Sequence, residues 1–147
     1  MAARAFFLAL MLFGASPAFA QGARNEVLGD WRTQGGWATI RIAACASEPV
    51  RLCGTIIALR RPNGPDGQPL RDSENPNPAL RSRPLVGLPF LIGFRERGGR
   101  WIGGHIYDPD SGRTYDSNMR LRPDGSLEVN GCVLFFCQAQ VWSRATP

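Results

Sequence analysis

The amino-acid sequence predicts an all-β fold, a small antiparallel up-and-down β-barrel of about eight strands. Short segments in which apolar and polar residues alternate recur along the chain, and no long segment follows the helical period. Gly, Pro, Asn and Asp bound these segments, as is typical of the tight turns between antiparallel strands.

The predicted strands follow one another in meander order. In the segment that begins at Trp37, for example, Ala38, Ile40 and Ile42 share one face and Arg41 lies on the other. The predicted strands are residues 28–33, 37–44, 50–59, 90–95, 100–107, 113–121, 126–129 and 134–144. Pairing of the last strand with the first would close the barrel and remove its edges.

Residues 61–89 form one long excursion that is rich in Pro and Asn. Loops of this length in a compact domain are usually functional or disordered. Because the excursion contains Leu80, Leu85 and Leu88, we expect parts of it to pack against the barrel. Asn77 and Pro78 together predict a single helical turn, with Asn77 as its cap.

Residues 1–20 have the pattern of a cleaved signal peptide: Arg4, an apolar run over 5–13, and small residues up to Ala20. The run is shorter than the roughly 20 apolar residues that span a bilayer, although an uncleaved anchor is the alternative. We therefore expect a periplasmic or secreted protein that does not span a membrane, with residues 21–147 as a single domain.

The four cysteines all follow the predicted cleavage site, where an even number indicates disulfides. Three connectivities are possible, and we favour the local pairs Cys45–Cys53 and Cys132–Cys137. The second pair requires residues 133–136 to turn, because a straight strand would separate its Cα atoms by about 16 Å. With no CxxC and a single histidine, we expect neither a metal site nor a cofactor.

The net charge is +5, and every basic residue is Arg. Either coding bias or recognition of carboxylate or phosphate explains this composition, since the guanidinium group pairs with both. The arginines are scattered among acidic residues rather than clustered in a stripe, so nucleic acid is not an expected partner.

Residues near the two ends of the chain would contact each other in a closed barrel. If the first and last strands are neighbours, Arg144 can lie across the indole of Trp31 in a cation–π contact, with Trp142 as the competing ring. Gly29 would allow the close backbone approach. This G-x-W with a C-terminal Arg resembles the lipocalin-type (calycin) arrangement.

A wider set of motifs occurs in order along the chain. They are Gly29-x-Trp31-x-Thr33, Leu52-Cys53-Gly54-x-Ile56, Asp72-x-x-Asn75-Pro76, Leu80-Arg81-x-Arg83-x-Leu85-x-Gly87, Gly104-x-Ile106-Tyr107-Asp108-Pro109-x-Ser111-Gly112-x-Thr114-Tyr115, Gly131-Cys132, Cys137 and Trp142-x-Arg144. Together they resemble the exported bacterial family called domain of unknown function 2147, in which Lys is common where this chain has Arg. The resemblance implies a calycin-like barrel in the cell envelope and no agreed activity.

Two functions are expected for such a barrel. The first is binding of an apolar or amphipathic small molecule in or at the mouth of the barrel, where Gly93, Gly103 and Gly104 would leave room. The expected wall residues are Phe90, Trp101, Tyr107, Tyr115 and Met119, and Arg81 or Arg83 would hold the polar end. The alternative is an envelope protein or cell-wall interaction module with a filled core.

No catalytic activity is expected. His105 is the only histidine, so any catalytic pair would have to use it, and no nucleophile is placed beside a base. We expect structural roles for Asp72 and Asn75. Asp72 would pair with Arg81 or Arg83, and Asn75 would cap a turn that shapes the excursion.

Overall fold

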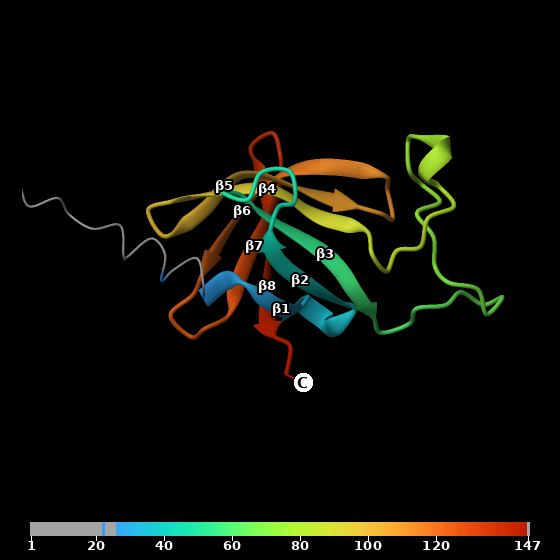
Figure 1. The fold of residues 1–147 in the computed structure, drawn as a ribbon, viewed down its shortest axis with the longest axis horizontal. Coiled ribbons are helices and arrows are strands. Elements are labelled where there is room, and N and C mark those ends of the chain that lie inside the picture. Colours follow the sequence, from blue (N-terminus) through green and yellow to red (C-terminus); the bar gives the residue numbers. More distant parts are fainter. Residues whose placement is uncertain (1–21, 23–25, 147) are drawn as a thin grey trace, which may run out of the picture.

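The computed structural model describes residue 22 and residues 26–146, so the predicted signal peptide lies outside the described residues. Eight antiparallel strands form one closed barrel in chain order, in which β8 also pairs with β1 (Figure 1). The strands are β1 (Gly29–Arg32), β2 (Ala38–Ala44), β3 (Leu52–Leu59), β4 (Pro89–Arg97), β5 (Arg100–Asp108), β6 (Arg113–Leu121), β7 (Leu127–Val133) and β8 (Phe136–Arg144). The predicted up-and-down barrel is thereby confirmed.

The alternating residues form the core as predicted. On β2, Ala38, Ile40 and Ile42 are buried and Arg41 is exposed, because side chains alternate between the two faces of a strand. Leu52 and Ile56 of β3 face the same interior. One continuous apolar core therefore fills much of the barrel.

Arg144 closes the barrel against the first strand. Trp31 and Arg144 are direct partners across β1 and β8, and the guanidinium carbon lies 4.0 Å from the Trp31 ring centroid. Arg144 Nη1 also donates a hydrogen bond to the Leu28 carbonyl at 2.7 Å, and Nη2 donates to the Glu26 carbonyl. At Gly29 (φ 109°) a Cβ would lie 3.1 Å from Arg144 Nη1, so the small residue accommodates this contact.

The glycines of β4 and β5 do not leave interior space, contrary to the expectation from the sequence. Gly93 and Gly103 adopt φ values of 71° and 64° beside irregularities in the strand pairing. At Gly104, a Cβ would lie 2.4 Å from the ring of Phe94, which already fills the position. These residues therefore bend the strands and admit a neighbouring ring.

Both favoured disulfides are present. Cys45–Cys53 closes the β2–β3 connection, and Cys132–Cys137 joins two residues that face each other across β7 and β8, with Cα atoms 4.0 Å apart. Val133 pairs with Phe136, so the chain turns at residues 134–135. For this reason β8 begins at Phe136, two residues later than predicted, and β7 extends to Val133.

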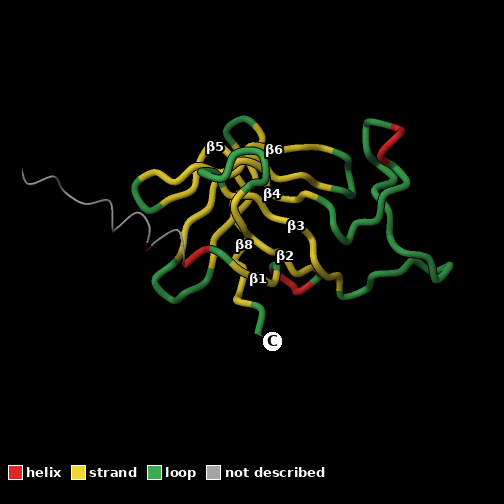
Figure 2. Tube along the Cα trace, in the orientation of Figure 1, coloured by secondary structure: helices red, strands yellow, loops and turns green. Residues whose placement is uncertain are grey.

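The excursion between β3 and β4 projects from one end of the barrel as a long loop with one short helical turn (Figures 1 and 2). The turn is the 3-10 helix η2 (Pro78–Leu80), and Asn77 caps it by accepting a hydrogen bond from the Ala79 amide at 3.1 Å. A second 3-10 turn, η1 (Gln34–Gly36), connects β1 and β2. Among the described residues, no helix has the length and hydrophobicity that crossing a membrane requires.

Candidate functional site

A cavity of about 580 Å³ opens at the end of the barrel where β7 and β8 meet the β5–β6 turn. Most of the lining residues are apolar or aromatic, and the polar side chains are two amides in the wall and two carboxylates at the rim. The lining residues are Trp37, Phe90, Ile106, Tyr107, Asp108, Pro109, Asp110, Tyr115, Val129, Gly131, Val133, Phe136, Cys137, Gln138 and Gln140.

A glycine lies on the wall of the cavity in β7. The inward positions of β7 are Leu127, Val129 and Gly131, and the first two are fully buried in the core. At Gly131 a Cβ would meet only Ile106, at 3.5 Å, so the wall recedes where the previous two positions filled the interior. The cavity therefore lies at the gap that Gly131 leaves between Val129 and Val133 in this row of side chains.

Aromatic rings form the floor of the cavity. Phe90 packs edge-on against Trp37, with ring centroids 5.7 Å apart, and lies 6.2 Å from the buried ring of Trp142. Because Trp142 is fully buried and Phe90 nearly so, this floor separates the cavity from the core. Edge-on and tilted ring contacts of this kind add to the packing energy of the floor.

Two amides supply polar groups to the β8 side of the wall. Gln138 faces Gly131 and Gln140 faces Val129 across the β7–β8 ladder. Gln140 Oε1 accepts a hydrogen bond from Trp142 Nε1 at 2.9 Å, which orients this amide. The wall thus combines apolar area with side chains that can accept or donate a hydrogen bond.

Carboxylates stand at the rim on the β5–β6 turn. Asp108 Oδ2 accepts a hydrogen bond from Ser111 Oγ at 2.6 Å, and Oδ1 accepts from the Asp110 amide at 3.1 Å. Asp108 is therefore held in place by its own turn, next to the half-buried Tyr115. The polar groups nearest the opening are acidic or neutral rather than basic.

A buried polar network fastens the excursion to the barrel beside this site. Asp72, whose side chain is fully buried, accepts hydrogen bonds from Tyr107 Oη (2.6 Å) and Asn75 Nδ2 (2.7 Å). Arg83 Nε donates a third hydrogen bond at 2.9 Å, and Arg83 Nη2 lies 2.8 Å from Asp72 Oδ2 in the same ion pair. Arg81 Nε donates to the Asn75 carbonyl at 2.7 Å. Every one of these bonds joins the excursion to itself or to β5.

The Tyr107 hydroxyl has a higher pKa than an ordinary tyrosine. Burial raises the pKa of the Tyr107 hydroxyl above its ordinary value, and its hydrogen bond to the Asp72 carboxylate raises the pKa further. The phenol is therefore neutral and donates its proton to Asp72. The hydroxyl is engaged in docking the excursion and is not available to a ligand.

The predicted ligand-binding residues lie in three places, namely the cavity, the core and the excursion. Phe90, Tyr107 and Tyr115 line the cavity. Trp101 and Met119 are direct partners across β5 and β6 and are buried in the core, so they do not reach the cavity.

The two arginines expected to hold a polar ligand group have other partners. Arg83 pairs with Asp72, and Arg81 donates to the backbone of the excursion. Both arginines therefore stabilise the loop in which they lie. Neither lines the cavity. Asp72 and Asn75 occupy the structural positions proposed from the sequence, and Asn75 Oδ1 accepts a hydrogen bond from the Asn77 amide at 2.9 Å.

Sequence reasoning missed Trp37, Gly131, Gln138 and Gln140 as cavity residues. The alternation Leu127, Val129, Gly131 was the signal that could have found the glycine, since it places a residue without a side chain on the core face. The sequence contained no such signal for the glutamines, because the face of the sheet to which their side chains point depends on how β8 is aligned with β7.

His105 lies on the outside of the barrel. Its Nδ1 is 3.2 Å from Asp116 Oδ1, and both side chains are well exposed. It is not among the cavity residues. In the part of the chain that the structure describes, no three His, Cys, Asp or Glu side chains gather as they would to hold a metal ion.

Comparison with known proteins gives two matches. The model of one family, DUF2147, described as uncharacterized protein conserved in bacteria, matches residues 29–144. Among solved structures, the chain is similar to HP1028 of the human pathogen Helicobacter pylori, described as belonging to the lipocalin family. The TM-score is 0.68 at 22% identity, over 82% of this chain and 83% of that chain. No curated protein matches the sequence.

Proposed function

Because the chain belongs to the DUF2147 family, whose description assigns no activity, its function has to be inferred from the barrel, and we propose small-molecule binding. In this proposal, an apolar or amphipathic molecule occupies the mouth of the barrel, above the floor made by Phe90 and Trp37. The likeness to a lipocalin-family protein supports the fold on which the proposal rests.

The cavity volume is the observation that carries the proposal. About 580 Å³ lies within the range of roughly 300–1,000 Å³ that is usual for small-molecule sites. The interior below the floor is filled by buried side chains. A protein that bound its partners only through its outer surface would not require a cavity of this size beside Gly131.

The lining also suggests the chemistry of the ligand. The aromatic floor and the apolar walls favour a ring or an aliphatic chain. The carboxylates at Asp108 and Asp110 favour a polar end that donates hydrogen bonds, and the amides of Gln138 and Gln140 can pair with either a donor or an acceptor. We therefore propose a neutral or cationic polar end in place of the anionic group that Arg81 or Arg83 would have recognised.

We further propose that the protein acts after export and is not an enzyme. The N-terminal sequence and the two disulfides support export to an oxidising compartment. The position of His105 beside Asp116 on the outer face, away from the cavity, supports a role in binding rather than in acid–base catalysis.

A cavity-filling variant tests the proposal directly. In Gly131→Phe, the new ring enters the cavity, while in the matched control Ala139→Phe the same ring is added on the exposed side of β8. We expect the wild type and the control to bind the neutral apolar fluorophore N-phenylnaphthylamine, and Gly131→Phe to lose at least about tenfold in affinity. Equal binding by both variants would contradict the proposed site.

Native mass spectrometry of the protein purified from its own cells identifies the natural occupant. A co-purifying small molecule that is absent from Gly131→Phe is the expected result. A bound protein in place of a small molecule would favour an envelope interaction module instead.

A further inference from the structure

The charged side chains that line the cavity are all acidic. Asp108 and Asp110 are its two carboxylates, and no Arg or His of the described chain joins them in the lining. The chain as a whole has 17 arginines against 12 acidic residues, for a net charge of +5. The cavity is therefore an acidic site in a basic protein.

The carboxylate of Asp108 lies on the inner side of β5 at the mouth of the barrel. Asp108 follows Ile106 by two residues, so both side chains are on the same face of the strand, and both residues line the cavity. Oδ2 accepts from Ser111 Oγ at 2.6 Å, and Oδ1 accepts from the Asp110 amide at 3.1 Å. Each carboxylate oxygen has two lone pairs, so each can accept one more hydrogen bond from a ligand.

An aromatic side chain stands next to this carboxylate. Tyr115 is the direct strand partner of Ile106 and lines the cavity. Its hydroxyl lies 3.4 Å from Ser111 Oγ, which in turn donates to Asp108. Because the face of an aromatic ring attracts cations, a positive group bound to Asp108 would have a second favourable contact within reach.

Two arginines lie near the opening, but neither neutralises the carboxylate. Arg113 is the strand partner of Asp108, yet no ion pair joins the two side chains in the part of the chain that the structure describes. Arg60 Nη1 donates to the Gly35 carbonyl at 3.2 Å, and the Arg60 amide donates to the Trp37 carbonyl at 2.8 Å. Neither arginine lines the cavity. The charge of Asp108 is therefore available to a ligand.

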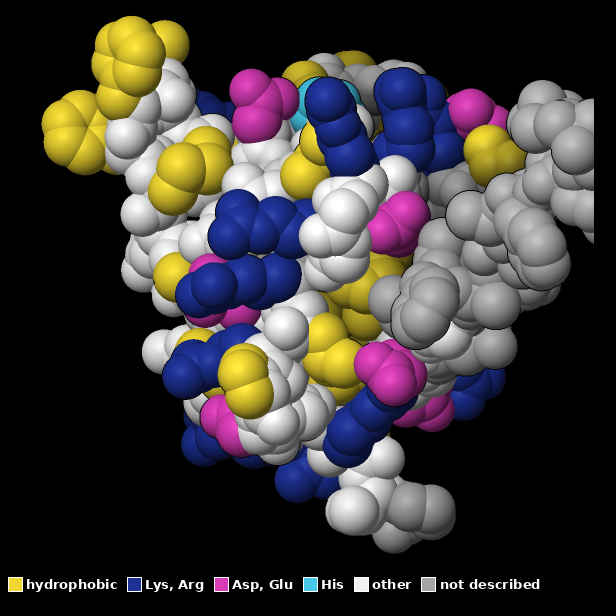
Figure 3. All heavy atoms as spheres, turned by 90° about the vertical axis from the view of Figure 1, so that its left-hand side faces the viewer, with side chains coloured by type: hydrophobic (Ala, Val, Ile, Leu, Met, Phe, Trp, Pro, Cys, Tyr) yellow, Lys and Arg dark blue, Asp and Glu magenta, His cyan; other side chains and the backbone are white. Residues whose placement is uncertain are grey.

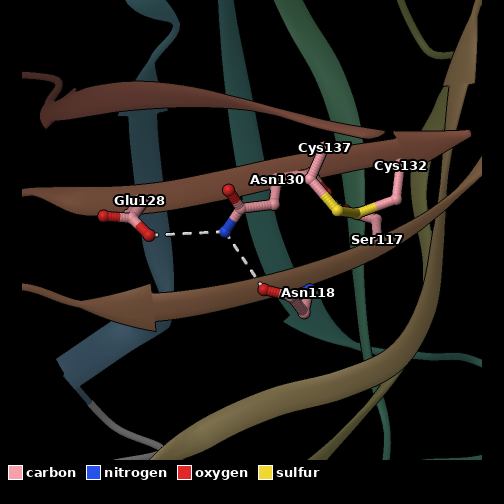
Figure 4. The surroundings of a disulfide bond; sticks show 6 residues. All are labelled: Ser117, Asn118, Glu128, Asn130, Cys132 and Cys137. Carbon is pink, nitrogen blue, oxygen red and sulfur yellow. Dashed lines mark hydrogen bonds between the residues drawn. A yellow bond between two sulfur atoms is a disulfide. The ribbon is translucent and has the colours of Figure 1, made fainter. Parts of the chain in front are cut away.

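The acidic side chain of the neighbouring strand β7 serves the outer surface instead. Glu128 pairs with Arg120 at 2.8 Å, and its Oε1 accepts from Asn130 Nδ2 at 3.4 Å (Figure 4). Glu128 and Asn130 alternate along β7 with Val129 and Gly131, which line the cavity, so they lie on the opposite face of the strand. The carboxylates of the cavity are therefore those of the β5–β6 turn.

Arginines gather at the other end of the barrel. In the β4–β5 hairpin, at the opposite end of β5 from Asp108, Arg97 and Arg100 are direct strand partners, and Arg100 also faces Arg120. Arg97 and Arg100 have no acidic partner among the described residues. Figure 3 views the left-hand side of Figure 1 and shows several arginine side chains across this surface. This distribution of charge favours a cation at the mouth and disfavours one at the arginine-rich end.

The same cavity offers surface to an apolar chain. Phe90 and Trp37 form the floor, and Val133 and Phe136 are cross-strand partners that line the opening. Val133 and Phe136 are nevertheless 54% and 83% exposed. A chain that lay against them would remove their apolar surface from water.

We propose that the cavity selects a protonated amine with an apolar chain, and that Asp108 is the residue that recognises the positive end. This selectivity rests on the proposed small-molecule binding and adds to it the charge of the ligand and the residue that recognises it. An organic cation fits better than a metal ion, since no three His, Cys, Asp or Glu side chains of the described chain gather to hold a metal.

Competition against N-phenylnaphthylamine tests the charge selectivity of the exported protein. Decylamine, decanol and decanoate share one chain length and differ in the charge of the head group, and each is used at neutral pH below the concentration at which it forms micelles. We expect the wild type to bind decylamine at least roughly tenfold more tightly than decanoate. Decanol is the neutral reference that reports on the apolar part of the site.

Asp108→Asn removes the charge and can keep the turn, because the Asn oxygen can accept from the Asp110 amide and its NH2 group can donate to Ser111 Oγ. Asp124→Asn is the matched control with the same change in net charge. Asp124 accepts from the Ser126 amide and hydroxyl in a similar turn between β6 and β7, at the other end of the barrel. We expect Asp108→Asn to bind decylamine roughly tenfold more weakly and decanol within about twofold of the wild type. The control should match the wild type for all three compounds.

Equal decylamine affinities of Asp108→Asn and the wild type would overturn the selectivity, as would equal binding of decylamine and decanoate by the wild type. If Asp108→Asn fails to fold, the salt dependence of the wild type decides. Added NaCl should weaken decylamine binding and strengthen decanoate binding, because salt screens exposed charges; the same response of both compounds would refute recognition by charge. A wild type that binds neither the fluorophore nor decanol would contradict the proposed function itself, whereas binding of both without a charge preference would contradict the amine alone.

Discussion

Asp72→Asn is the sharpest perturbation of the network that fastens the excursion to the barrel. The substitution keeps the size of the buried side chain and replaces one carboxylate oxygen with an NH2 group. In the wild type, Asp72 Oδ2 accepts from Asn75 at 2.7 Å and from Arg83 Nε at 2.9 Å, and it forms an ion pair with Arg83 Nη2 at 2.8 Å. In the variant, an NH2 group at the Oδ2 position would face the Asn75 and Arg83 donors, and one at the Oδ1 position would face the donating Tyr107 hydroxyl. In either orientation the charge that pairs with Arg83 is lost.

The magnitude follows from these contacts. Hydrogen bonds to charged groups contribute about 1.5–3 kcal/mol each, but the Arg83 side chain is 33% exposed and can recover part of its solvation. Asn75 retains its hydrogen bond to the Tyr107 hydroxyl at 3.1 Å. We therefore expect the docking of the excursion to weaken by about 2–4 kcal/mol, with the barrel less affected.

Limited trypsin digestion measures this local opening. In the wild type, Arg81 Nε donates to the Asn75 carbonyl, which restrains the backbone around the exposed Arg81–Ser82 bond. If cleavage follows opening, Asp72→Asn should speed it by roughly 30-fold or more. Asp66→Asn is the matched control, since Asp66 lies in the same excursion, where its carboxylate accepts from the Gln68 amide. Cleavage of the Asp72 variant within about twofold of the control would refute the docking role.

Three further predictions concern closure of the barrel, pH and a close contact. Arg144→Met should lower the melting temperature by about 3–6 °C in calorimetry, because a cation–π contact of about 0.5–2 kcal/mol and its hydrogen bonds are lost. The raised pKa of Tyr107 predicts stability that is full below the ordinary tyrosine pKa of about 10 and falls as pH rises through the raised value. Denaturant titrations should show a shallower alkaline loss for Tyr107→Phe, and equal slopes would contradict the assigned group. In Gly112→Ala, the new Cβ would lie 1.9 Å from the Glu74 carbonyl oxygen, so hydrogen exchange in the excursion should accelerate. In Gly125→Ala, where φ is 80° but no atom lies within 4 Å, the excursion should exchange as in the wild type.

The sequence alone was enough to predict the number and order of the strands, to favour the disulfide pairs that form and to suggest how the barrel closes. Alternation on β2 and β6 is a local property, because each residue's facing depends only on its neighbours along the strand. The short separation of Cys132 and Cys137 required a turn between them, whatever the rest of the fold. Trp31 and Arg144 were predictable as partners once the first and last strands were taken to be neighbours.

Only the tertiary structure decided where the interior is empty and which charges are already engaged. Gly104 and Gly131 look alike in the sequence, but the ring of Phe94 fills the space at one and nothing but Ile106 approaches the other. Arg83 was a plausible ligand contact until its partner Asp72 was seen to be buried beneath it. A cavity is the difference between the volume that the strands enclose and the side chains they direct inward, so it depends on register and closure across all eight strands.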